Sequence, residues 1–306
     1  MIRITNGMLI NELKYNLNNN YTNMDKYQRQ LATGRKINLP SDNPAGLVKS
    51  LRLRTNLVEG EQYLANINEG INFMETTDAA LDNLTAIMQR IRELAVNAAN
   101  GTNDDSARKA IADEIKELTD QITIVANTSY GSKYIFAGTN VTQQPCQEDS
   151  DPDTFKWTGN NEALQLEIGV GVKLTINLTD SSMNNFFADT GTDPDDFGVI
   201  SFCAGLADDI EAGNLDAVNA ALTTADKFID NLLTARSTIG AKVNRLELQQ
   251  SRLDSTQISY TSLLSQNEDA DIAEVIMNLK MQESVYRASL AAGARIIQPS
   301  LVDFLR

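Results

Sequence analysis

Apolar residues recur at alternating spacings of three and four over about 50 residues of the C-terminal half, the period of packed helices. Twelve of the fifteen a and d positions are apolar in the ladder Leu215, Val218, Leu222, Ala225, Ile229, Leu232, Arg236, Ile239, Val243, Leu246, Gln250, Leu253, Gln257, Tyr260 and Leu264. The ladder predicts one helix about 75 Å long at the usual rise per residue. Such length usually serves to build something extended rather than to enclose a pocket.

The first 100 residues predict two further helices. Gly34 and Pro40 end the first at about residue 33, and Asn43 can cap the second with Pro44 at its first position, where a missing N–H costs nothing. The second helix extends to about residue 100 and is long enough to pack antiparallel on the later ladder. The seam of the first helix is formed by Ile10, Leu13, Leu17, Asn20, Met24, Tyr27 and Leu31.

The middle of the chain changes from helical to alternating patterns. A third helix is predicted to about residue 126, capped by Thr102 or Asn103. Between residues 164 and 178 apolar side chains occupy every second position, which predicts strands, and Gly169 and Gly171 favour a bend or a tight hairpin between two short ones. A short helix is expected over 197–210, and a last helix capped by Asp269 after a polar break at 266–269.

These elements predict a mainly α fold: a long antiparallel helical bundle or coiled-coil rod with terminal helices and a small β-containing insert domain. The expected segments are a terminal helix and linker at 1–43, rod at 44–140, the variable β-containing insert at 141–196, rod at 197–265 and a terminal helix at 266–306. The terminal helices have no third partner within the chain. Because ordering costs about 1 to 2 kcal/mol per residue, we expect both to be largely disordered in the isolated chain and to order against neighbours.

Composition excludes several classes of function. The chain has 26 basic and 41 acidic residues, a net charge of −15, which opposes binding to nucleic acid. No run of apolar residues predicts membrane insertion, and the start lacks the pattern of a cleaved signal peptide. Histidine is absent, so triads with an imidazole base and histidine-ligated zinc sites are excluded. We therefore predict no enzyme activity, no metal and no cofactor.

Two cysteines, Cys146 and Cys203, stand alone in the sequence. Their spacing matches neither a metal cluster nor a disulfide framework. Two separate thiols are the simplest interpretation, and a single bridge between them stays open.

Three separate sequence blocks carry a family resemblance. Residues 33–38 (TGRKIN) with 40–47 (PSDNPAGL), residues 89–96 (QRIRELAV) with 99–102, and residues 239–246 (IGAKVNRL) resemble the bacterial flagellin superfamily. The segments 134–138, 164–178, 269–274, 286–290 and 300–306 are more similar to the hook-filament junction proteins of that superfamily. Val302 departs from the larger residue expected there, so filament flagellin itself is the alternative, and a flagellin-like surface adhesin is the second.

The resemblance implies a structural subunit of the bacterial flagellum that joins hook and filament by coiled-coil assembly of its terminal helices. The implied partners are copies of itself in a ring layer, hook-associated protein 1 on the hook side, flagellin on the filament side and a flagellar export chaperone. It also implies type III export without a cleaved signal and an extracellular location. Flagellin relatives with an inserted protease need a zinc-binding histidine pair, which this chain lacks.

Candidate assembly residues follow from the seams and the resemblance. Arg90, Arg92 and Glu93 are candidates for contacts with neighbouring subunits, although a solvated helix face explains them equally well. Trp157 is the aromatic residue of interest for an adhesin, and packing inside the insert is its other interpretation. The family linker motif comprises Ser41, Asp42, Asn43 and Pro44. The predicted assembly seam comprises Leu13, Leu17, Met24, Leu31, Ile276, Leu279, Tyr286, Leu290 and Ile297, with a purely intramolecular seam as the alternative.

Overall fold

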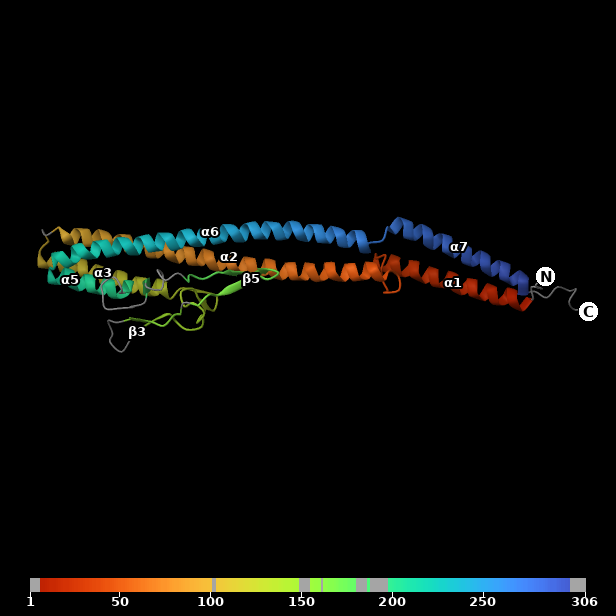
Figure 1. Cartoon of the computed structure of the whole chain (residues 1–306), viewed down its shortest axis with the longest axis horizontal. Coiled ribbons are helices and arrows are strands. Elements are labelled where there is room, and N and C mark those ends of the chain that lie inside the picture. The colour runs from red at the N-terminus through yellow and green to blue at the C-terminus, as the bar shows by residue number, and fades with distance from the viewer. Residues whose placement is uncertain are drawn as a thin grey trace, which may run out of the picture. The chain divides into compact units, whose positions relative to one another are not determined.

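The computed structural model describes residues 6–100, 103–148, 155–160, 162–179, 186–187 and 198–297. The chain divides into two compact units. The terminal unit comprises Met1–Glu59 with Ser255–Arg306, and the central unit comprises Gly60–Asp254. The two longest helices, α2 (Pro44–Ala99) and α6 (Leu215–Glu268), each contribute to both units (Figure 1). The predicted mainly helical fold with small strands in a middle insert is confirmed.

In the terminal unit, α1 (Asn6–Thr33) packs antiparallel on α7 (Ile272–Ile297). Gly34 ends α1 with a φ of 69°, a left-handed conformation that glycine adopts without a steric penalty. The predicted start of α2 is confirmed, because it begins at Pro44 and the Asn43 side-chain oxygen accepts the Gly46 N–H at 3.0 Å.

The start of α7 differs from the prediction. The Asp271 carboxylate accepts the N–H groups of Ala273 at 2.9 Å and Glu274 at 3.2 Å, so Asp271 and not Asp269 caps this helix. The helix break predicted at 266–269 also begins later than expected, since α6 continues through Glu268. Only residues 269–271 separate the two helices.

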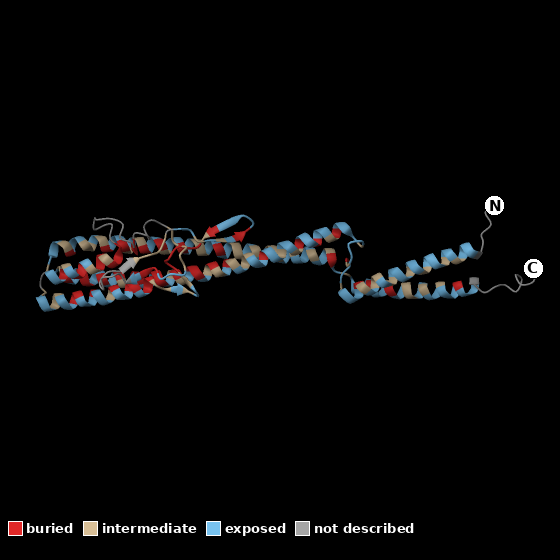
Figure 2. Cartoon of the chain, turned by 90° about the horizontal axis from the view of Figure 1, so that it is seen from below, coloured by how far each residue is buried: buried red, intermediate tan, exposed pale blue. Residues whose placement is uncertain are grey.

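In the central unit, α2, α3 (Asp105–Ala126), α5 (Val199–Ala212) and α6 surround one apolar core. Figure 2 shows that buried positions concentrate in this bundle, whereas α1 and α7 are mostly half-buried or exposed. The Asp104 side chain caps α3 by accepting the Ala107 N–H at 2.8 Å, so the predicted cap at Thr102 or Asn103 is wrong. The core includes the fully buried side chains Met74, Leu81, Leu84, Met88, Ile91, Ile115 and Leu232.

Two of the polar interruptions in the α6 ladder pair with side chains on α2. The Arg236 guanidinium lies 3.1 Å from an Asp78 carboxylate oxygen and 2.6 Å from one of Asp82. The Gln250 amide donates to the Asn68 side-chain oxygen at 2.8 Å. Because partner numbers on α2 fall as those on α6 rise, the two helices run antiparallel in the central unit. These polar pairs replace apolar contacts without leaving charges unpaired at the helix interface.

Within the described ranges, the strands form three antiparallel two-stranded pairs. The hairpin predicted between residues 164 and 178 is confirmed as β5 (Gln165–Gly169) and β6 (Val172–Thr175), with Gly171 in the turn at a φ of 69°. β3 (Cys146–Glu148) pairs with β4 (Phe155–Trp157). The short pair β1 (Ser129–Tyr130) and β2 (Lys133–Tyr134) was not predicted from the pattern. Two residues per strand are too few to show a period.

Among the described residues, no helix combines the length and apolarity that crossing a bilayer requires. Cys146 and Cys203 are free, buried thiols, as the simpler sequence interpretation expected. Burial raises the pKa of each thiol to about 12. Both are therefore protonated and poorly nucleophilic at neutral pH.

Candidate functional site: the terminal helix pair and its linker

Five predicted assembly residues lie in the seam between α1 and α7. Leu13, Leu17 and Met24 are half-buried on one face of α1. On α7, Leu279 is buried and Tyr286 is half-buried. The pair therefore excludes water only in part, which is the pattern of a two-helix contact without a third element.

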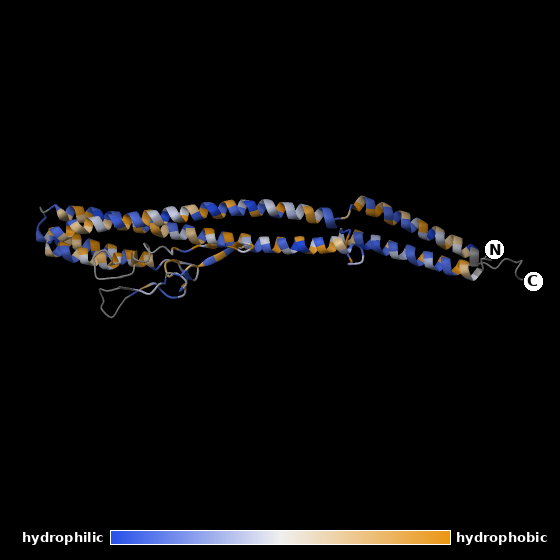
Figure 3. Cartoon of the chain, viewed as in Figure 1, coloured by the Kyte–Doolittle hydropathy of each residue, from blue (hydrophilic) through white to orange (hydrophobic). Residues whose placement is uncertain are grey.

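Three other predicted assembly positions are exposed in the single chain. Leu31, Ile276 and Leu290 remain 38%, 44% and 46% exposed. Ile297 ends α7, and its side chain lies outside the described residues. A second exposed apolar row on α7 was not predicted and consists of Met277, Met281 and Val285. Figure 3 shows apolar positions along the length of α7. A role of these positions in contacts between subunits stays a prediction.

The linker between α1 and α2 folds around Asp42. Its carboxylate accepts the N–H groups of Leu39 at 3.0 Å and Asn38 at 3.2 Å, and its own N–H donates to the Leu39 carbonyl at 3.0 Å. Pro40 and Ser41 occupy the intervening turn, where proline pre-sets the backbone φ. Burial opposes ionisation, but the two backbone donors and the nearby cations Lys26 and Arg29 hold the pKa of Asp42 below its usual range.

This depressed pKa predicts an acid-sensitive linker. The stabilisation by Asp42 is complete above the unfolded-state pKa of about 3.9 and is lost as pH falls through the lower folded-state pKa. We expect the hydrogen-exchange protection factors of the Asn38 and Leu39 amides to fall below about pH 4 for this reason. In Asp42→Asn these protection factors should already be several-fold lower at pH 7 and should not change with pH. The same acid transition in both proteins would contradict this role for Asp42.

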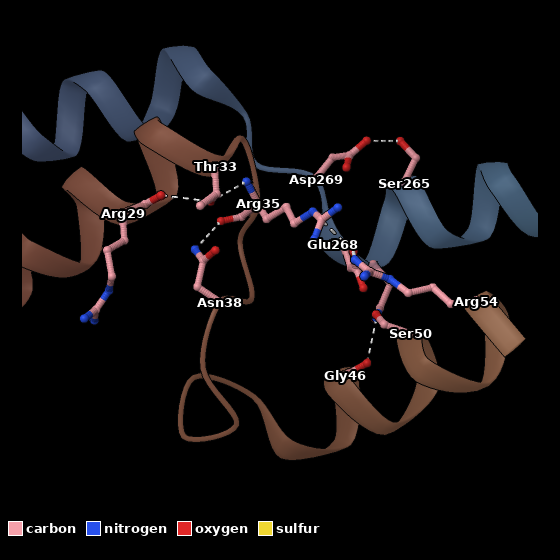
Figure 4. Close-up of polar contacts among 11 residues, drawn as sticks. Arg29, Thr33, Arg35, Asn38, Gly46, Ser50, Arg54, Ser265, Glu268 and Asp269 are labelled. Atoms are coloured by element: carbon pink, nitrogen blue, oxygen red, sulfur yellow. Dashed lines mark hydrogen bonds and ion pairs between the residues drawn. The ribbon is translucent and has the colours of Figure 1, made fainter.

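A cluster of three charged residues holds the linker against the end of α6. Glu268 is buried, and its carboxylate pairs with the guanidinium of Arg54 and lies 3.7 Å from that of Arg35. Figure 4 shows both arginines directed toward Glu268 from the linker and from α2. We call Arg35, Arg54 and Glu268 the linker cluster.

Backbone and amide contacts reinforce the linker cluster. The Lys36 N–H donates to the Glu268 carbonyl, and the Ala270 N–H donates to the Gly34 carbonyl at 3.0 Å. The Asn267 amide donates to the Gly46 carbonyl at 2.8 Å and to the Ser50 hydroxyl at 2.6 Å. The segment that follows α1 is thereby joined to the segment that precedes α7. The sequence contains one weak signal for this cluster, because opposite charges lie near two predicted helix ends. It does not indicate that these charges pair.

Removing one arginine from the linker cluster should destabilise the terminal unit. Arg54→Ala leaves the buried Glu268 carboxylate with a single, more distant cation, so we expect a loss of about 1 to 2 kcal/mol, discounted because Arg54 itself is partly exposed. Arg52→Ala removes an exposed arginine from the same turn of α2 and should change stability by less than about 0.5 kcal/mol. The measurement is thermal unfolding of both variants at low and high salt. Equal shifts in the two variants would contradict the assignment.

Arg90, Arg92 and Glu93 lie on an exposed face of α2 in the central unit. Arg90 pairs with Glu114 of α3 at 2.7 Å and with Glu93 at 3.2 Å. Arg92 pairs with Asp226 of α6 at 2.5 Å. Arg90 and Arg92 therefore join α2 to other helices of the same chain, whereas Glu93 pairs within α2. Contacts of the three with a neighbouring subunit stay a prediction.

Trp157 is partly buried and packs against the apolar core. Its indole Nε1 is buried, with no hydrogen-bond partner among the described residues. The ring also lies over Gly159, where an added Cβ would come within 2.3 Å of it. This placement agrees with packing inside the insert rather than with an exposed ligand-binding aromatic.

Comparison with known families matches both ends of the chain. The model of the bacterial flagellin N-terminal helical region matches residues 4–141, and that of the C-terminal helical region matches residues 222–305. The first match contains all of α1, the linker, α2 and α3. The second contains most of α6 and all of α7. The insert lies between the two.

Relatives and solved structures agree with these matches. The chain is 25% identical to flagellar hook-associated protein 3 of Escherichia coli, across 95% of this chain and 96% of the relative. It is 28% identical to the flagellin of Bacillus subtilis, across 94% and 93%. The crystal structure of hook-associated protein 3 from Legionella pneumophila has a TM-score of 0.62 at 14% identity and covers 71% of this chain and 98% of that one. Two family models, relatives aligned over nearly their whole length and a shared fold place the chain in the bacterial flagellin family.

Proposed function

We propose that this protein is the subunit that joins the hook of the bacterial flagellum to its filament. It is a structural flagellar protein by family, and the finer assignment rests chiefly on one observation. The alignment with hook-associated protein 3 extends over 95% of this chain and 96% of the relative. The two chains therefore align over nearly their whole lengths, which supports the assignment. The tail segments at 269–274 and 286–290 support the same assignment.

The assembly mechanism that we propose uses the terminal unit. Ile276, Leu290 and the row Met277, Met281 and Val285 are exposed in the single chain. Burial of such side chains yields about 25 cal/mol per Å² of apolar surface removed from water. Neighbouring copies that cover these rows would form a coiled-coil layer. The function requires no bond-breaking chemistry, and we assign the chain no catalytic role.

Partners and location follow from that role. A junction subunit would contact other copies in its own layer, hook-associated protein 1 on the hook side and flagellin on the filament side. A flagellar export chaperone would hold the terminal helices before export. Export through the flagellar type III apparatus would deliver the chain to the outside of the cell without a cleaved signal peptide.

Filament flagellin is the second candidate, favoured by the 28% identity to the Bacillus subtilis protein over 94% of this chain. Purified protein distinguishes the two functions. A junction subunit should add a single short layer to isolated hooks that carry hook-associated protein 1. A flagellin should extend preformed filament seeds into long helical filaments when it is the only protein supplied.

Deletion of the gene in the source bacterium tests the proposal. Electron microscopy should show cells that keep their hooks and lack filaments, and unassembled flagellin should accumulate in the medium. A plasmid copy of the wild-type gene should restore filaments. Hooks without filaments and without secreted flagellin would instead indicate that this chain is the flagellin. Intact filaments would overturn both candidates.

A further inference from the structure

Three polar side chains meet in the middle of the largely apolar α1/α7 seam. The Gln282 amide donates to the Asn20 side-chain oxygen at 3.0 Å. The Asn20 amide donates to the Ser289 hydroxyl at 3.3 Å. All three residues are half-buried. Asn20 therefore uses both ends of its amide, and it depends on α7 for both partners.

Asn20 occupies a seam position whose neighbours on the same face, Leu17 and Met24, are apolar. An apolar residue would bury more surface at this position, so asparagine lowers the stability of the pair. In coiled coils, a single buried asparagine is retained where it restricts partner and register, because a mismatched partner leaves its amide without hydrogen bonds. The triad of Asn20, Gln282 and Ser289 has the chemistry for such a restriction.

A second position in the seam specifies the same alignment. Gly293 is buried on α7, and a Cβ built on it would lie 2.5 Å from the Cδ2 of Leu13. Leu13 thus fits opposite a residue that lacks a side chain. Leu13 faces Gly293 and Asn20 faces Gln282 and Ser289 only when the two antiparallel helices have one particular register.

We propose that the triad of Asn20, Gln282 and Ser289 is a specificity element that restricts α1 to α7 in this register and disfavours pairing with the same helix of a second copy. In an α1–α1 pair, Asn20 would lose both Gln282 and Ser289, and the seam positions beside it, Leu17 and Met24, are apolar. If α1 slipped by seven residues toward the linker, the neighbours of Asn20 on α7 would be Val275 and Gln282. Ser289 would no longer lie beside it. In each case at least one seam amide loses a partner.

The inference goes beyond the proposed function, because it concerns the soluble subunit and holds whether the chain is a junction protein or a flagellin. It also differs from the role of the linker cluster. The cluster fixes the end of the helix pair nearest the linker, whereas the triad lies about three turns away from it. The triad therefore acts where the covalent linker constrains the helices less than it does at their linker ends.

Cysteine cross-linking in the full-length chain tests the proposal. Leu13→Cys with Gly293→Cys reports the native register. Leu13→Cys with Tyr286→Cys reports a slip of seven residues. Positions 286 and 293 lie about 10 Å apart along α7, so a cysteine at position 13 cannot form a disulfide with both in one alignment. Leu13→Cys alone reports pairing of α1 with another copy as a covalent dimer. The native thiols do not interfere, because both are buried.

Each cysteine background is combined with Asn20→Leu and, as the matched control, with Met24→Leu. We expect Asn20→Leu to increase the slipped or intermolecular cross-link at least fivefold while the summed yield of all cross-links from position 13 stays unchanged. Met24→Leu should leave the pattern unchanged. Gln282→Leu with Ser289→Ala, which removes the α7 partners and keeps Asn20, should reduce the native cross-link.

Two results would overturn the proposal. One is an unchanged cross-link pattern in Asn20→Leu, which would mean that the register is fixed elsewhere. The other is a loss of the native cross-link with no slipped or intermolecular product, which would mean that the triad only stabilises the pair. Light scattering of the same variants at micromolar concentration distinguishes slipped monomers from dimers.

Discussion

Leu81→Ala is expected to lower the free energy of unfolding of the central unit by about 3 kcal/mol, since truncating a fully buried leucine costs about 2 to 5 kcal/mol. Leu81 lies on α2 with none of its surface exposed, inside the core shared with α3, α5 and α6. Its loss creates a cavity that rigid, close-packed helices fill only in part. Urea denaturation followed by circular dichroism measures the change as a lower midpoint with an unchanged slope.

The chain offers a matched control for this prediction. Leu248 lies on α6 in the same unit and is 74% exposed. Leu248→Ala should change the free energy of unfolding by less than about 0.5 kcal/mol. If both substitutions lowered stability equally, the burial of the α2 seam described above would be wrong.

Hydrogen exchange in the dilute, isolated chain should differ by at least about a thousandfold between the central unit and the terminal helix pair. The central core contains many fully buried side chains on four helices, whereas the α1/α7 seam is mostly half-buried. A pair that buries so little gains too little free energy to offset the ordering of more than 50 residues. Amides of α1 and α7 should therefore exchange within seconds.

Assembled protein provides the comparison for this experiment. After incorporation into flagella, the same amides should become protected to about the level of the central unit, because neighbouring copies cover the exposed rows of α7. The central unit serves as the internal reference in both states. Strong protection of both terminal helices in the dilute chain would contradict the proposed coupling of order to assembly.

The helical elements followed closely from the sequence because their apolar period is long and regular. The ladder from Leu215 predicted α6 to within a few residues of its end, and Asn43 with Pro44 predicted the start of α2. The alternation near Gly169 and Gly171 predicted the β5–β6 hairpin. Each of these signals depends on neighbours in the sequence, which is where pattern reasoning is strongest.

The helix starts at α3 and α7 were less predictable. Thr102, Asn103 and Asp104 are adjacent residues that can all cap a helix, and so are Asp269 and Asp271 on either side of one alanine. The backbone selects among them by geometry that the sequence does not specify. In both cases an aspartate later in the sequence than the predicted residue supplied the cap.

The candidate site was predicted in part for a similar reason. The helical period identified Leu13, Leu17 and Tyr286 as seam residues, but it could not separate the face of α7 that packs on α1 from the exposed rows around Met281. The linker cluster was missed entirely. Arg54 and Glu268 are 214 residues apart in the sequence, and no local spacing connects them.

That separation has a consequence for the order in which the molecule matures. The defining contacts of the terminal unit connect positions more than 200 residues apart, such as Ser50 with Asn267 and Asn20 with Ser289. Contacts this distant in the sequence close late and slowly, because the loop entropy must be overcome first. A chain that enters solution one end first would thus complete its compact core before its two extremities could meet. The surfaces of the terminal helices that bind neighbouring copies would be the last to form.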